Sequence, residues 1–217
     1  MNQPQEQPQN YKIQPFFSTW LHPKKTAQYL IDHKKWTYSL IFVLLGGIAS
    51  GITGLAASDF YPTYSTWILL LACILVGPCI GIFSVTISTF FTWLVGKIFG
   101  GKGSFEDIFK VTSLSYVPTI AIAPFLLLWM ANSPLTYFDT SIEFSAVTII
   151  SVIIFMLVSI VSGIWSFVIS VAGVAIAHRF SNWKAFFTLI IPGIIFLAFI
   201  IGLIVLLIFS LGGTYTY

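Results

Sequence analysis

The sequence GKIFGGKGSFEDIFKVTSLSYVP, residues 96–118, joins two long apolar segments and contains the signals that decide the fold. A cluster of three glycines breaks the preceding helix and gives a turn. Ser104 then begins a new helix, with Glu106 and Asp107 in its first turn, where the positive end of the helix dipole favours carboxylates. Residues 115–118, Ser-Tyr-Val-Pro, carry that helix into the bilayer. The stretch therefore predicts a polar turn between two membrane-spanning helices.

The composition places the whole chain in a membrane. Of its 217 residues, 57% are hydrophobic and only 8% are charged, whereas a soluble domain carries about 25% charged residues. A soluble core of this length could not bury so much apolar surface. We therefore predict a polytopic membrane protein with no cleavable signal peptide.

Five apolar segments reach the length of about 20 residues that a helix needs to cross a hydrocarbon core of about 30 Å. The fourth has no polar turn in its middle and is therefore interpreted as a single span. The predicted spans are residues 36–57, 67–95, 111–130, 144–177 and 186–211. The fold class is all-α: a disordered polar tail at 1–15, a cytoplasmic amphipathic helix at 16–35, and a five-span membrane bundle at 36–217.

The amphipathic helix has an apolar stripe of Ala27, Leu30 and Ile31 beside four lysines. We interpret it as a helix on the membrane surface, with three aromatic side chains entering the interface: Phe16, Phe17 and Trp20. An ordinary cytosolic lead-in helix is the alternative.

The basic residues predict the orientation. All ten precede the first span or lie in the two connections on the same side, and they are Lys12, Lys24, Lys25, Lys34, Lys35, Lys97, Lys102, Lys110, Arg179 and Lys184. The opposite connections carry only Asp59, Asp139 and Glu143. By the positive-inside rule the N-terminus is cytoplasmic and the C-terminus lies outside, and we expect the membrane to be a bacterial cell membrane.

Small residues four positions apart predict where helices approach closely. They form three ridges, at Gly47 and Gly51, at Gly77 and Gly81, and at Ser162, Ser166 and Ser170. Plain packing within the bundle and a self-association face are both open interpretations. Prolines at 78, 118, 124 and 192 predict kinks, because each removes one backbone hydrogen bond of a helix.

The sequence offers no catalytic, cofactor or metal motif. No ionisable residue lies inside the apolar core of a predicted span, which disfavours ion-coupled transport. Three histidines, His22, His33 and His178, fall in interfacial segments without metal-ligand spacing, and we expect them to be solvated. Cys73 and Cys79 are six positions apart, on different faces of one helix, and are interpreted as unpaired thiols.

Three blocks resemble the Yip domain family of five-span membrane proteins. They are the aromatic and proline–basic segment at 20–27, the glycine loop and Tyr-Val-Pro entry at 100–118, and the segment at 178–185 followed by Pro192. The eukaryotic members carry an Asp-Leu-Tyr-Gly-Pro motif that this sequence lacks, so the resemblance is to a bacterial-type member. It implies a helical bundle that acts through partners and supplies no catalytic residues.

The sequence thus predicts a non-enzymatic membrane protein that binds partners or organises membrane processes through its cytoplasmic loops. A channel, transporter or lipid-handling protein built on proline-broken spans is the alternative. The expected partners are membrane lipids, a protein on the cytoplasmic face and further copies of the chain, with no nucleic acid and no cofactor. The candidate partner or headgroup contacts are Lys102, Ser104, Glu106, Asp107, Tyr116, Pro118, His178 and Lys184.

Overall fold

The computed structural model describes residues 13–56, 58–138 and 146–212, and all regular structure within these ranges is helical. Five helical segments are long and apolar enough to cross a membrane, as predicted. They are α3 (Trp36–Leu55), α4 (Thr66–Ile98), the segment Phe105–Asn132, α8 (Ala146–His178) and α9 (Asn182–Gly212). Most of the predicted polar tail and the residues Lys12, Asp139 and Glu143 lie outside the described residues.

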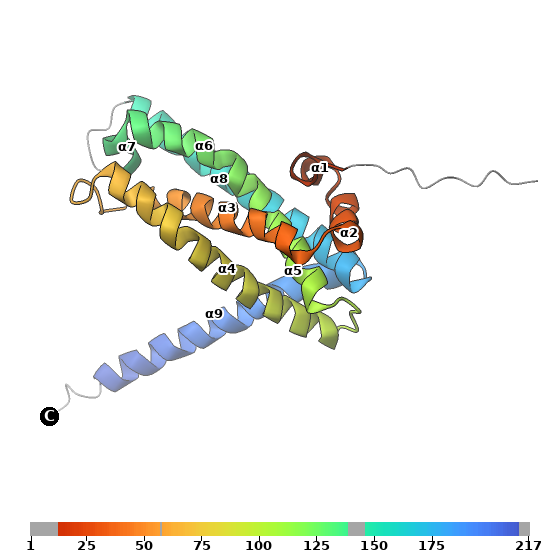
Figure 1. Cartoon of the computed structure of the whole chain (residues 1–217). Helices are drawn as coiled ribbons and strands as arrows, with labels where there is room; N and C mark the ends of the chain where they lie inside the picture. The colour runs from red at the N-terminus through yellow and green to blue at the C-terminus, as the bar shows by residue number, and fades with distance from the viewer. Residues whose placement is uncertain (1–12, 57, 139–145, 213–217) are drawn as a thin grey trace, which may run out of the picture.

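The connections between the helices lie at the two ends of the bundle (Figure 1). One end holds two short helices and two connections. The first connection, at residues 99–104, joins α4 to α5 (Phe105–Ser113), and the second, at residues 179–181, joins α8 to α9. This end is called the basic end here, because the predicted cytoplasmic lysines belong to these elements and their neighbouring turns. The opposite end holds the α3–α4 connection and the short helix α7 (Pro134–Phe138).

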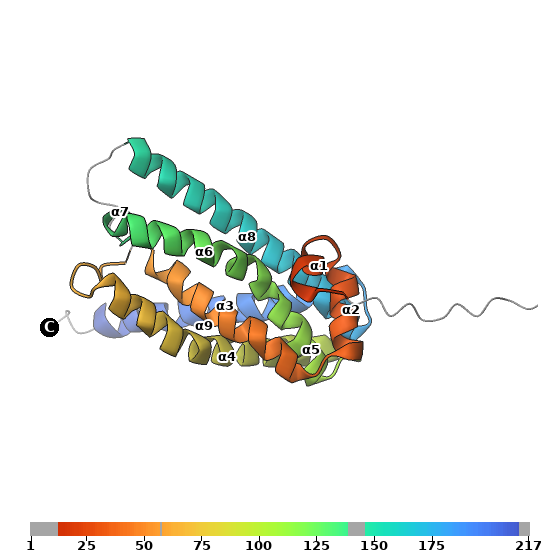
Figure 2. The ribbon, with the colours of Figure 1, turned by 45° about the horizontal axis from the view of Figure 1, so that its top comes forward.

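The segment before the first span forms two short helices rather than one, α1 (Pro15–Leu21) and α2 (Pro23–His33). Ala27 and Leu30 are fully buried in a core that includes residues of α5 and α8. Phe16 and Trp20 pack against the same core, while Phe17 remains 68% exposed. Much of the predicted interfacial stripe therefore contacts protein, because α2 lies against the end of the bundle (Figure 2).

The glycine ridges of α3 and α4 meet, as predicted. A methyl group built on Gly77 would lie 2.8 Å from the carbonyl oxygen of Gly47, and one built on Gly81 would lie 2.8 Å from that of Val43. Both distances are too short for a real Cβ atom, so the two backbones are in direct contact. This contact holds the first two spans together.

The third span bends just before Pro118, where the sequence predicts a kink, and the bend divides it into two helices. Helix α5 (Phe105–Ser113) ends in a 3₁₀ turn (Leu114–Tyr116), and α6 (Val117–Asn132) begins just before Pro118. Figure 2 shows the chain changing direction there. Proline explains the break, because its ring would clash with the carbonyl of the fourth residue before it in a continuous α-helix. Pro78, Pro124 and Pro192 instead lie inside their helices.

The opposite end is closed by α7. The Tyr137 hydroxyl donates a hydrogen bond to the carbonyl oxygen of Ile52, and the Trp129 indole donates one to Thr136 Oγ1 at 3.0 Å. Burial raises the pKa of the Tyr137 phenol, which keeps it protonated as a donor. These bonds fix the ends of α3 and α6 that lie opposite the basic end.

Helix α9 leaves the bundle (Figure 1). Ala185 and Thr188 near its start are fully buried, whereas Phe196 is 64% exposed and Leu206 67% exposed. The second half of this span therefore presents apolar side chains in every direction, as expected of a helix surrounded by lipid.

Candidate functional site

Two connections that are far apart in sequence lie side by side at the basic end. The amide of Lys102 donates a hydrogen bond to the carbonyl oxygen of His178 at 3.0 Å. Both connections turn sharply, with a positive φ of 78° at Gly100 and 57° at Arg179. The loop between the second and third spans is thus fastened to the end of the fourth.

The side chain of His178 is the centre of this junction, and the expectation that it is solvated is wrong. It is 1% exposed, and its ring stacks on Phe180 with centroids 5.1 Å apart and planes 17° apart. A methyl group built on Gly96 or Gly101 would overlap the imidazole. The loop covers the ring because glycines at these positions leave room for it. His22 and His33 are exposed, as expected.

Both nitrogen atoms of the imidazole are buried. Neither ring nitrogen has a hydrogen-bond partner of good geometry among the described residues. The atoms that enclose it are mainly glycine backbone and the Phe180 ring. The ring therefore packs the junction between the two connections.

The first turn of α5 carries the predicted N-terminal cap. The Asp107 amide donates to Ser104 Oγ at 3.1 Å, and the Ser104 amide donates to Asp107 Oδ2 at the same distance of 3.1 Å. This reciprocal pair is a capping box, which satisfies amides that the helix itself leaves unpaired. Ser104 and Asp107 therefore have a structural role in fixing the loop.

The next turn holds an ion pair that sequence reasoning missed. Lys110 Nζ lies 2.8 Å from Glu106 Oε1, and the Lys110 side chain is 7% exposed against 52% for Glu106. Sequence alone groups Lys110 with the other lysines of the connection between the second and third spans. The sequence does contain a signal for this ion pair. Glu106 and Lys110 are four positions apart on one helix, which places their side chains on the same face.

The remaining candidates separate into two groups. Lys102 and Lys184 are exposed at the basic end, where both are available to a partner. Tyr116 and Pro118 lie farther into the span, and the Tyr116 ring lies directly against Gly46 of α3. The structure thus joins Lys102, Ser104, Asp107 and His178 through the loop and leaves Tyr116 and Pro118 as packing residues.

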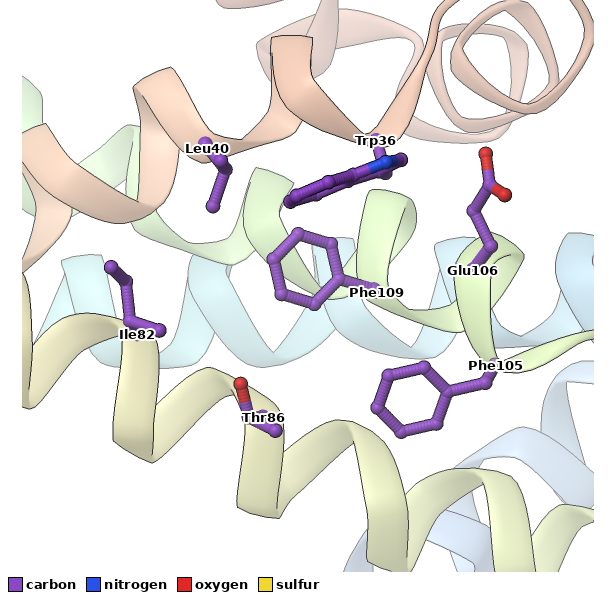
Figure 3. Close-up of a pocket in the computed structure, with 7 residues that line it drawn as sticks. All are labelled: Trp36, Leu40, Ile82, Thr86, Phe105, Glu106 and Phe109. Atoms are coloured by element: carbon purple, nitrogen blue, oxygen red, sulfur yellow. The ribbon is translucent and has the colours of Figure 1, made fainter.

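An apolar groove beside the ion pair was also missed. It has a volume of about 280 Å³ and runs between α3, α4 and α5. Figure 3 shows its lining residues, which are Trp36, Leu40, Ile82, Thr86, Phe105, Glu106 and Phe109. These residues come from three separate segments, so no local pattern in the sequence could have predicted it.

The capping box makes a direct prediction about the loop. Replacing Ser104 with alanine should lower the free energy of unfolding by about 1 kcal/mol, because the Asp107 amide loses its acceptor. Thermal unfolding of the purified protein in detergent measures the change. Ser104→Thr keeps the hydroxyl and should lose much less. Equal losses in the two variants would contradict a capping role.

Comparison with known proteins gives a match to a protein family. Within the described residues, no three His, Cys, Asp or Glu side chains gather closely enough to hold a metal ion. Neither a curated protein nor a solved structure matches the chain. The sequence model of the Yip1 domain matches residues 17–211, which is most of the chain, and the protein therefore belongs to the Yip1 domain family.

Proposed function

We propose that this protein is a non-enzymatic integral membrane protein that binds a protein partner through its basic end. The positive-inside rule places that end in the cytoplasm. The observation that carries the proposal is the junction of the two connections, in which the Lys102 amide is bonded to His178 and the adjoining helix is capped by Ser104 and Asp107. A surface held in one conformation loses little entropy when a partner binds.

The charge of this surface indicates the character of the partner. Lys102, Arg179 and Lys184 are exposed, and in the part of the chain that the structure describes the one ion pair joins Lys110 and Glu106. Three cations without intramolecular partners favour an acidic protein surface, which they would attract at long range.

A double charge reversal tests this proposal. Lys102→Glu combined with Lys184→Glu should abolish capture of the partner after crosslinking in native membranes, followed by purification and identification of the retained proteins. Both side chains are exposed, so the fold should be unaffected. Replacing Glu106 would break its ion pair with Lys110, and replacing Asp107 would remove part of the α5 cap. Either change would therefore affect the fold as well as the binding surface.

Two controls make this test specific. Lys102→Arg with Lys184→Arg keeps the charges and should retain capture. Lys24→Glu with Lys25→Glu changes the net charge equally at two exposed positions of α2 and should retain it as well. Unchanged capture by the Lys102 and Lys184 reversal would contradict the proposal.

A second candidate function is lipid or solute handling. It is favoured by grooves that open on the membrane-facing surface, including one of about 410 Å³ between α6 and α8. Purified protein in sealed vesicles would then move a labelled lipid or solute across the bilayer. Rates equal to those of empty vesicles would count against this function and would leave partner binding untouched.

A further inference from the structure

The groove between α3, α4 and α5 combines an apolar floor with a carboxylate at one end. Figure 3 shows Leu40 and Ile82 at one end of it, and Phe105 and Glu106 at the other. The Trp36 ring meets the Phe109 ring edge to face, with centroids 6.4 Å apart, and the two form part of its wall. Its volume of about 280 Å³ is near the lower limit for small-molecule sites, so it suits a narrow ligand such as one hydrocarbon chain.

The groove lies where a spanning helix meets the membrane interface. Trp36 is the first residue of α3, and Glu106 is in the first turn of α5, so both lie at the basic end. Two of its lining residues on the spanning helices are themselves exposed, Trp36 to 49% and Ile82 to 40%. The groove is therefore continuous with a surface that contacts the hydrocarbon chains of lipid.

The charged groups beside the groove, Glu106 and Lys110, favour one kind of lipid headgroup. Lys110 Nζ lies 2.8 Å from Oε1 of Glu106, and the Glu106 side chain is 52% exposed. The Lys110 side chain is 7% exposed, so the group offered at the mouth of the groove is the carboxylate. A carboxylate attracts a cation and accepts hydrogen bonds from a primary ammonium, whereas a quaternary ammonium has no N–H to donate.

We propose that this groove binds one phospholipid with a primary ammonium headgroup, its hydrocarbon chain along Leu40, Ile82 and Phe109 and its ammonium on Glu106. Lipid is favoured over a protein segment because the groove opens onto the lipid-facing surface of α3 and α4. The Lys110 ammonium offsets the charge of Glu106, so the preference comes from the N–H donors of a primary ammonium, which an anionic lipid such as phosphatidylglycerol lacks. This inference is independent of partner binding at Lys102 and Lys184.

Lipid titration followed by native mass spectrometry tests the site. Delipidated protein in detergent is mixed with phosphatidylethanolamine, phosphatidylcholine or phosphatidylglycerol of identical chains. The first phosphatidylethanolamine should bind about tenfold more tightly than either of the others, since a charge-assisted hydrogen bond contributes about that factor. Equal affinities for the three lipids would overturn the headgroup assignment.

Four variants localise the binding. Glu106→Gln should reduce the affinity for phosphatidylethanolamine to that for phosphatidylcholine, and Glu106→Gln with Lys110→Met should do the same without leaving a buried lysine unpaired. Thr86→Trp should fill the groove and remove the tight site. Ser88→Trp, at an exposed position on another face of α4, should preserve it.

Two results would overturn the proposal in different ways. If all three lipids bind equally and Thr86→Trp removes that binding, the groove holds a hydrocarbon chain without recognising its headgroup. If Thr86→Trp leaves the preference for phosphatidylethanolamine unchanged, the lipid binds elsewhere, and the groove is left to a partner segment or a second copy of the chain.

Discussion

Replacing Gly47 with alanine should cost about 3 kcal/mol of stability, because the added methyl group would overlap the backbone carbonyl of Gly77 on α4. A backbone carbonyl cannot rotate away as a flexible side chain can. The two helices would have to separate along their contact, and the loss would extend to Gly81, which also lies against α3. Thermal unfolding in detergent, followed by intrinsic tryptophan fluorescence, measures this effect.

Gly54 provides the matched control on the same helix. A methyl group built there meets no atom within 4 Å. Gly54→Ala should therefore be neutral or should stabilise α3, because alanine favours a helix more than glycine does. Equal destabilisation by Gly47→Ala and Gly54→Ala would show that the close contact of α3 and α4 is not important for stability.

Replacing His178 with alanine is expected to have the second large effect, a loss of about 2–5 kcal/mol, as for other large side chains removed from a core. The walls of the resulting cavity include Gly96 and Gly101, which have no side chains that could move in to fill it. The hydrogen bond from the Lys102 amide to the His178 carbonyl should open more often as a result. Amide hydrogen exchange at residues 99–104 measures this opening directly.

His33→Ala is the control for this substitution. His33 is exposed at the end of α2, where it stacks on Tyr29 with ring centroids 4.9 Å apart. Its removal should change stability by less than about 0.5 kcal/mol, the usual range for surface positions. Unchanged hydrogen exchange of residues 99–104 in His178→Ala would show that the imidazole does not hold the loop in place.

The sequence predicted those features that depend on local composition or on a fixed spacing. The spans followed from the length of apolar runs, and the start of α5 at Ser104 followed from its cap. Glycines four positions apart indicated that α3 and α4 each pack closely against a helix, since such ridges permit close approach in membranes, and the structure shows that the two ridges contact each other. The single fourth span followed from the lack of a polar turn.

The features that sequence reasoning missed depend on contacts between distant segments. His178 follows an apolar helix, like many interfacial histidines, and only the position of the 99–104 loop shows that it is buried. Lys110 is buried because α5 packs into the bundle, which no charge count could indicate. The kink at Pro118 was predicted, but its form was not: a 3₁₀ turn at Leu114–Tyr116 ends one helix before the next begins.

Photo-crosslinking from single positions in native membranes tests the central claim, that the junction at the basic end binds a protein partner. A photoreactive residue is introduced in place of Lys102, of Lys184, or of Leu135, which is 48% exposed at the opposite end. We predict that positions 102 and 184 crosslink to the same protein and that position 135 does not. Absence of a protein crosslink from positions 102 and 184, or the same crosslink from all three, would contradict it.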